Sequence, residues 1–160
     1  MRGYAGIAKV LIAHGADVNA PSIASGLTPL MAATSILKSV DIINVLLEHG
    51  AKVNDSAKKG MTALLMAAAF GNVPAIDTLL AHGADAKATD GHGWTALMAA
   101  AGHGHPEAVA DLVGHGADVA AKSNDGKTAA DLVCSSWGKW QKHSCPKKKI
   151  IAALASAPKR

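Results

Sequence analysis

The chain has 160 residues, enough for about one domain, and its formal net charge at pH 7 is +4. Aromatic residues make up only 3% of the sequence, so we expect a core of small aliphatic side chains that allows helices to pack closely. No apolar run reaches the roughly 18 residues of a membrane-spanning helix, and the first residues have the pattern of a helix of the domain rather than of a secretory signal.

The first predicted element is a helix from Gly3 to His14, and it leads into the tetrapeptide HGAD. Closely similar tetrapeptides recur at intervals of 35, 33 and 33 residues, beginning at His49, His82 and His115. A second phrase, Gly-x-Thr, recurs at intervals of 34, 33 and 33 residues and begins at Gly26, Gly60, Gly93 and Gly126. Two landmarks that share one period indicate a repeat protein whose units stack on their neighbours.

Each unit has the same predicted order of elements. The threonine of Gly-x-Thr is placed to cap a first helix rich in alanine and leucine, and Pro29 suits the first turn of the earliest of these helices. A polar or glycine turn and a second apolar helix follow. The glycine after each tetrapeptide histidine suits the left-handed residue that ends this second helix. The polar segment before the next Gly-x-Thr predicts a projecting, hairpin-like loop.

These units resemble ankyrin repeats. The phrases that carry the resemblance are GLTPLMAAT from Gly26, GMTALLMAA from Gly60, GWTALMAAAGHGHPEAV from Gly93 and GKTAADLV from Gly126. The resemblance covers Gly3 to about Val133 and implies an all-α solenoid of stacked helix-turn-helix units with projecting hairpin loops. One family feature is missing, because the histidine of the first helix is replaced by Met31, Leu65, Met98 and Asp131. We expect apolar packing in place of the polar tie that this histidine makes between loops.

The periodicity divides a single domain, residues 1–160, into five parts: a half repeat, three repeats and an irregular capping repeat, at 1–20, 21–54, 55–87, 88–120 and 121–160. The half repeat lacks a first helix, so the chain is either a trimmed piece of a longer protein, which we favour, or begins with a natural cap. Repeat 21–54 has one extra residue near ILKSV (36–40), which we expect to be a neutral insertion. The alternative is that it shapes one end of the binding surface.

The capping repeat contains an inserted loop, 134–145, flanked by the chain's two cysteines, Cys134 and Cys145. We predict a disulfide between them, worth about 3 kcal/mol by the chain-entropy estimate. A disulfide favours a secreted or periplasmic protein, whereas two reduced thiols would favour the cytoplasm. A zinc site using Cys134, His143 and Cys145 is a weaker alternative because it lacks a fourth ligand.

The sequence predicts neither an enzyme nor a metal or cofactor site. The tetrapeptide histidines are expected to bond the last carbonyls of their helices, and a dedicated metal site would not recur in every unit. His103 and His105 are expected in the turn between two helices, with stray metal binding as the alternative. No phosphate-binding loop, nucleophile elbow or carboxylate pair is present. Asp131, Ser135 and His143 are close in sequence, but nothing sets the geometry of a triad.

The resemblance implies that a partner would contact the loop tips, the residue between Gly and Thr, and the end of the first helix. Carried onto this chain, these positions are Leu27, Ile36, Lys58, Lys59, Met61, Phe70, Asp90, His92, Trp94, His103, Asn124, Asp125 and Lys127. Phe70 and Trp94 stand out because aromatic residues are few and are favoured binding anchors. The alternative is that Leu27, Met61 and Trp94 fold back onto their own loops.

We therefore predict a monomeric, non-enzymatic scaffold that binds a partner protein of unknown identity in a concave groove and takes no small-molecule substrate. The alternative is a module of a larger protein whose basic tail contacts nucleic acid or an anionic membrane. From Lys139 onward the chain has seven basic residues and no acidic one, which leaves nine basic against twelve acidic residues elsewhere. We favour a solvated helical cap over a nucleic-acid or membrane contact at this tail.

Overall fold

The computed structural model describes residues 2–36, 40–136 and 145–157. Within these residues the α-helices are α1 (Arg2–Ala13), α2 (Pro29–Thr34), α3 (Val40–Glu48), α4 (Ala63–Ala69), α5 (Val73–Ala81), α6 (Ala96–His103), α7 (Pro106–Gly114) and α8 (Lys147–Ala155), and one 3-10 turn, η1 (Lys58–Gly60), lies in a loop. The prediction of an all-α repeat fold is confirmed. None of the helices in the described residues has the length and hydropathy needed to cross a bilayer.

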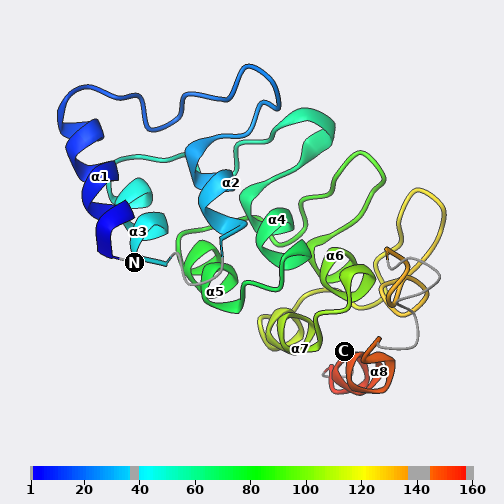
Figure 1. Ribbon diagram of the computed structural model, residues 1–160. Helices are drawn as coiled ribbons and strands as arrows, with labels where there is room; N and C mark the ends of the chain where they lie inside the picture. The colour runs from blue at the N-terminus through cyan, green and yellow to red at the C-terminus, as the bar shows by residue number, and fades with distance from the viewer. Residues whose placement is uncertain (1, 37–39, 137–144, 158–160) are drawn as a thin grey trace.

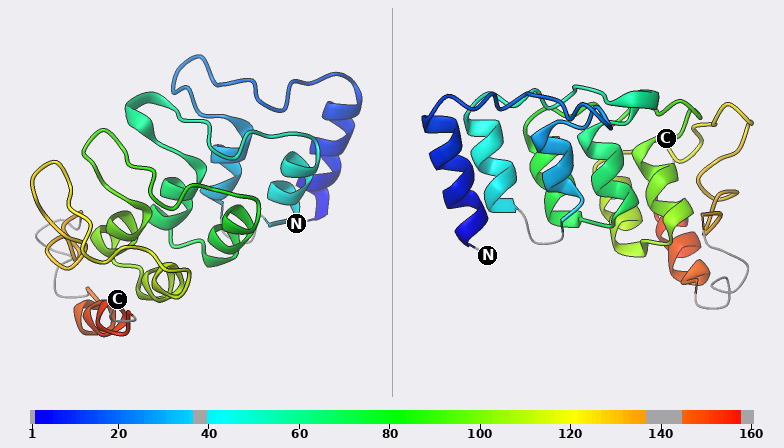
Figure 2. Two further views of the ribbon diagram at one scale, coloured as in Figure 1. Left: turned by 180° about the vertical axis from the view of Figure 1, so that it is seen from behind. Right: turned by 45° about the horizontal axis from the view of Figure 1, so that its top comes forward.

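The helices form two layers, with the loops projecting from one edge (Figure 1). The helices α2, α4 and α6 lie side by side in one layer, and α1, α3, α5, α7 and α8 succeed one another in the second. Within the proposed repeats 21–54, 55–87 and 88–120, the pairs α2–α3, α4–α5 and α6–α7 pack against each other. Figure 2 shows the same succession from behind and from above. Each repeat therefore buries its apolar faces against its neighbours, as expected of a solenoid.

The predicted helix boundaries depend on two local devices. Thr28, Thr62 and Thr95 have extended backbones, and their hydroxyl oxygens accept the backbone N–H three residues later at 3.3 Å. The second helices end in glycines with φ between 81° and 88°, at positions 15, 50, 83 and 116. After each of these glycines an alanine N–H donates to a leucine carbonyl five residues back, at 2.9–3.0 Å. This bonding satisfies carbonyls that the helix end would otherwise leave open.

The core confirms the expected apolar replacement of the family histidine. Met31, Leu65 and Met98 are only 1–2% exposed. Fully buried alanines, such as Ala67 and Ala100, lie beside them and let neighbouring first helices approach closely. Burying a side chain of this size stabilises a fold by about 1.5–3 kcal/mol.

The fourth first helix, expected after Thr128, is not formed. Residues 129–136 instead make a succession of turns, in which Cys134 has a φ of 55°. The physical reason is Asp131, which occupies the position of the buried methionines and would be costly to bury as a carboxylate. Asp131 stays exposed, and its Oδ2 accepts the Thr128 backbone N–H at 2.9 Å and the Thr128 hydroxyl at 2.8 Å. These bonds, the backbone one first, lower the pKa of Asp131.

The turn segment 129–136 closes the end of α6. The backbone N–H of Cys134 donates to the Ala101 carbonyl at 2.9 Å, and that of Ser136 donates to the Gly102 carbonyl at 3.1 Å. Cys134 also forms a disulfide with Cys145, across a Cα–Cα distance of 6.2 Å. The bridge connects this turn segment to the start of α8, and it leaves neither sulfur free for the alternative zinc site. His143, the third proposed zinc ligand, lies outside the described residues, as do 37–39 of the extra-residue segment ILKSV.

Side-chain amides tie each repeat to the next along the loop edge. Asn19 donates to the Gly50 carbonyl at 3.1 Å and accepts the Lys52 N–H at 2.9 Å. Asn54 repeats both bonds one unit later, to the Gly83 carbonyl at 3.0 Å and from the Asp85 N–H at 2.9 Å. The same position in the next unit is Lys87, so this asparagine ladder ends there.

A second set of ties lies at the inter-helix turns. Asn72, which caps α5, donates to the carbonyls of Thr34 and Ile36 at 3.0 and 3.1 Å. His105 occupies the equivalent position before α7, and its Nε2–H donates to the Ala69 carbonyl at 2.9 Å. Partial burial is the main cause of the lowered pKa of His105, so the ring is held in its neutral form.

Candidate functional site

A row of side chains crosses the stack at the ends of the first helices. Ile36 and Phe70 are large apolar side chains that are 55% and 50% exposed, and His103 continues the row as a half-buried residue. Phe70 is the C-cap of α4, Ile36 follows α2 by two residues, and His103 is the last residue of α6. Because the three helices lie side by side, the row joins three repeats (Figure 1).

A second row lies one helical turn earlier and was missed by the sequence analysis. Ala32 is exposed, Met66 is half-buried and Ala99 is buried. They precede the three residues of the first row by four positions, which places Met66 and Ala99 about one helical turn before Phe70 and His103. The four-residue spacing was visible in the sequence and would have been enough to find them. Two of the three are alanines, whereas Met66 adds a larger apolar side chain one helical turn before Phe70.

The residues between Gly and Thr form a third row, which is less accessible than the first. Leu27, Met61 and Trp94 are half-buried, whereas Lys127 is exposed. The Trp94 ring lies against Gly102 of its own repeat, so closely that a Cβ at Gly102 would be 2.9 Å from Trp94 Cζ3. Leu27 and Trp94 pack against the core. Trp94 therefore covers the end of α6 and offers only part of its ring to a partner.

Several loop-tip residues hold neighbouring loops together. Lys58 Nζ donates to the Ala24 carbonyl at 3.0 Å, and the Lys59 carbonyl accepts the Gly91 N–H at 2.6 Å. One repeat later, Asn124 donates through its backbone to His92 at 3.0 Å and through its side chain to Gly91 at 3.1 Å.

Asp90 acts within its own loop, where its Oδ1 accepts the backbone N–H groups of His92 and Trp94 at 2.9 Å. Asp90 therefore fixes the conformation of its own loop, whereas Lys58 and Asn124 fix the position of one loop relative to the next. Asp125 and His92 have exposed side chains at the loop tips. Contact of any of these residues with a partner stays a prediction.

Two clefts adjoin the loops. One, of about 430 Å³, lies at the N-terminal end of the candidate face and includes Leu27, Thr28 and Ala32 among its lining residues. The other, of about 590 Å³, lies where the asparagine ladder ends and is lined by Lys87, Asp118 and Lys122 among others. The loss of the asparagine tie at Lys87 is the local feature that coincides with this opening.

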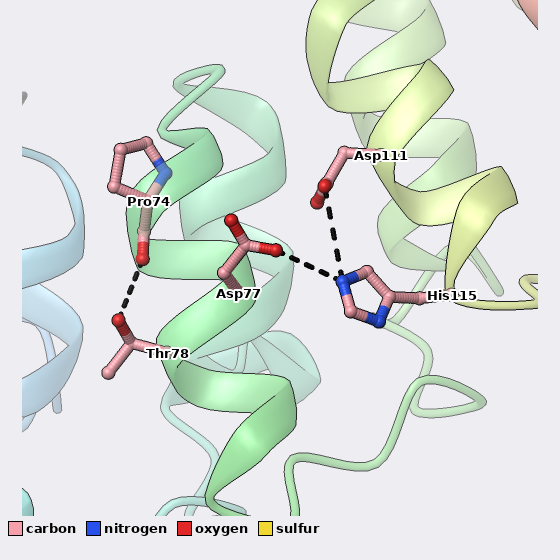
Figure 3. Close-up of polar contacts among 5 residues, drawn as sticks. All are labelled: Pro74, Asp77, Thr78, Asp111 and His115. Atoms are coloured by element: carbon pink, nitrogen blue, oxygen red, sulfur yellow. Dashed lines mark hydrogen bonds and ion pairs between the residues drawn. The ribbon is translucent and has the colours of Figure 1, made fainter.

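The tetrapeptide histidines divide into three that behave alike and one that does not. The Nδ1 atoms of His14, His49 and His82 lie 2.7–2.8 Å from the carbonyl four residues back, as predicted for helix-end residues. His115 instead directs Nε2 to Asp77 Oδ1 at 3.0 Å, and Asp111 Oδ1 lies 3.9 Å away (Figure 3). His103 also differs from expectation, since it ends α6 rather than lying in the turn, and its Nδ1 lies 2.9 Å from the Ala99 carbonyl.

Of the residues considered for a catalytic triad, the structure describes Asp131 and Ser135. Asp131 directs its carboxylate to Thr128, and Ser135 lies in the turn segment with its hydroxyl near Gly102. His143 lies outside the described residues. The sequence coincidence therefore gains no support from the geometry of Asp131 and Ser135.

The family model described as ankyrin repeats (3 copies) matches residues 1–57 and 54–123. No curated protein matches the chain.

Proposed function

The chain belongs to the ankyrin-repeat family, whose repeats generally serve as protein–protein interaction modules, and from this premise we propose that it is a monomeric, non-enzymatic scaffold for a partner protein. The partner would lie across the concave face made by the first helices and the loops. The single observation that supports this surface is the pair Ile36 and Phe70, which are in register on neighbouring repeats and half exposed. Adjacent exposed apolar side chains with a polar rim commonly mark an interaction site.

The surroundings of the pair suggest what the partner would present. Met66 and the partly exposed Trp94 extend the apolar surface toward the middle of the stack. Toward the C-terminal end the rows change to His103 and Lys127, which are polar or charged. We therefore expect a partner with an apolar centre over α2 and α4 and a polar or acidic margin near α6. Aromatic and aliphatic anchors at the centre of an interface carry most of its binding energy.

The test is affinity capture from a lysate of the source organism with three versions of the chain. The wild type and an Ile7→Ala variant should recover the same partner protein, because Ile7 is an exposed apolar residue on α1, away from the candidate face. An Ile36→Ala/Phe70→Ala variant should lose that partner by at least about tenfold. Circular dichroism melting of each variant controls for loss of fold. Equal recovery by all three versions would refute the assignment of the face.

A salt series in the same capture experiment separates a second candidate function. Lys147, Lys148 and Lys149 are exposed in the first turn of α8, where no acidic residue balances them and where the helix dipole disfavours cations. These lysines would suit an anionic partner such as nucleic acid or membrane lipid. Binding through them would weaken steeply between about 50 and 200 mM salt. Binding through Ile36 and Phe70 should persist over the same range.

A further inference from the structure

Three metal-ligating side chains converge at the junction of α5 and α7. Asp77 comes from the middle of α5, Asp111 from α7, and His115 is the C-cap residue of α7 (Figure 3). His115 Nε2 lies 3.0 Å from Asp77 Oδ1 and 3.9 Å from Asp111 Oδ1. Among the described residues, one ligand atom from each of the three lies within 4.8 Å of the others. The cluster joins two neighbouring repeats.

The cluster is peculiar to this junction and does not follow from the repeat. Relative to the tetrapeptide histidine, the position of Asp77 is Asn44 in the previous unit and Ala110 in the next, whereas the position of Asp111 is Val45 or Thr78. Thr78 uses its hydroxyl to bond the Pro74 carbonyl at 2.8 Å (Figure 3). The recurring histidine therefore meets two carboxylates only where an aspartate occurs at both positions.

His115 has a different hydrogen-bond partner from the histidines at the same position in the other repeats. Whereas His14, His49 and His82 direct Nδ1 to a backbone carbonyl of their own helix, the His115 Nε2 is directed across the junction to Asp77. The His115 and Asp77 side chains are 44% and 54% exposed, so an ion from solution can reach them without any opening of the fold.

The charge of the cluster is unbalanced. Within the described residues, the ion-pair partner of both carboxylates is His115. Asp111 Oδ2 is buried and has no hydrogen-bond partner. The cluster combines two carboxylates with a single imidazole, and a buried carboxylate oxygen without a hydrogen-bond partner is costly.

We propose that Asp77, Asp111 and His115 form a binding site for a divalent transition-metal ion of the Zn²⁺ type. Zinc sites with three protein ligands keep a remaining position for water, and bonds of about 2.0–2.2 Å place neighbouring ligand atoms about 3.3 Å apart. The distances of 3.0 and 3.9 Å bracket this spacing. An imidazole together with carboxylates favours Zn²⁺ or Co²⁺ over Mg²⁺ and Ca²⁺, which prefer oxygen ligands alone. The bound ion would clamp α5 to α7 and so stabilise one repeat on the next.

The test is Zn²⁺ binding to the full chain, with its disulfide intact, after removal of metal by a chelator. Competition with a chromogenic chelator should show one ion per chain, and the melting temperature should rise with Zn²⁺ concentration because the folded state binds the ion. His115→Ala and Asp77→Asn should each weaken binding by at least about tenfold and abolish the rise in melting temperature. His82→Ala is the matched control, since His82 occupies the same repeat position and its Nδ1 lies 2.8 Å from the Thr78 carbonyl of its own helix.

The control separates a specific site from general binding by surface histidines. Retained binding in His82→Ala and lost binding in the two site variants supports the proposal. Equal loss in His82→Ala, or a wild-type chain that neither binds Zn²⁺ at one ion per chain nor gains thermal stability from it, would overturn it. Asp77→Asn keeps the size and shape of an exposed side chain, so this variant remains informative if His115→Ala disturbs the end of α7.

Discussion

The two ends of the stack are finished in different ways. At the N-terminal end, α1 packs on α3 and leaves Ile7, Val10 and Leu11 more than half exposed. At the C-terminal end, α8 packs on α7, buries Ile150 and Leu154, and turns its lysines to solvent. A terminal repeat needs a polar outer face, because no further repeat covers it. The exposed lysines of α8 come closer to this requirement than the outer side of α1 does, although Ile151 of α8 is 39% exposed.

The means of attachment also differ. Helix α1 corresponds to the second helix of a repeat and keeps the regular spacing. The loop that follows it is hydrogen-bonded to the next repeat through Asn19. The helix α8 follows an insertion that breaks the register, and the Cys134–Cys145 bridge brings its start back to the end of α6 through the turn segment 129–136. The disulfide therefore attaches α8 at the point where the regular repeat spacing ends.

The largest expected effect tests the packing of the two end helices. Ile150→Ala should lower the free energy of unfolding by about 2–5 kcal/mol, since Ile150 is 0% exposed. Ile7→Ala, the same substitution on α1, should change it by less than about 0.5 kcal/mol because Ile7 is 57% exposed. Urea unfolding of both variants measures the difference. Equal losses would mean that the ends are not packed differently.

The next effect tests the covalent attachment. A Cys134→Ser/Cys145→Ser variant should lose about 3 kcal/mol of stability, as expected for a loop of this length. Hydrogen exchange should show the loss of protection concentrated in α8 and in residues 129–136, with α1 to α5 unaffected. A uniform loss along the whole stack would show that the bridge does not act locally. Thiol counting on the unfolded, unreduced wild type should find no free thiol.

The smallest expected effect is a difference in pH dependence between the inter-repeat tie made by Asn72 and the one made by His105. Asn72 does not titrate, whereas burial is the main cause that lowers the pKa of His105. The hydrogen bond to the Ala69 carbonyl opposes this shift, the charge of His103 adds to it, and the charge of Glu107 opposes it. The neutral ring contributes fully above the unfolded pKa of about 6.5, and this contribution is lost as the pH falls through 6.5 and then through the folded pKa.

A His105→Asn variant copies the tie that Asn72 makes in the previous repeat, and its amide has no proton to gain. Its free energy of unfolding should therefore fall less than that of the wild type between pH 7 and pH 5, with little difference at pH 7. Denaturant unfolding across this range measures both curves. Parallel curves for the two proteins would show that His105 does not carry the acid sensitivity.

Much of the fold could be predicted from the sequence, because the features that set the helix ends act on residues close to them in the chain. The caps Thr28, Thr62 and Thr95 and the left-handed glycines act within a few residues of themselves, so their spacing predicted the helix ends correctly. Asp131 was visible as a departure from the family pattern, but its consequence was not. Whether a carboxylate at that position is buried or turned outward depends on the surrounding packing. Asp131 is turned outward, and segment 129–136 forms turns in place of the expected helix.

The candidate site was harder to predict from the sequence than the fold. The register of Ile36, Phe70 and His103 follows from the period, and the structure adds that the first two are half exposed. The half-burial of Trp94 against Gly102 could not be predicted, because it depends on the path of the loop over α6. The loop-tying roles of Lys58 and Asn124 also depend on which backbone group of the neighbouring loop lies opposite.

The sequence by itself determined the period, the caps of the first three repeats and the two cysteines at one insertion, because these are set by residues close together in the chain. The tertiary structure decided everything that needs two repeats at once. Asn72 and His105 gained their carbonyl partners only through stacking, and His115 met Asp77, 38 residues away, only across the junction of α5 and α7. Repetition sets the spacing of the units, but the partner of each side chain is chosen by whichever atoms the stacked neighbour places within hydrogen-bonding distance.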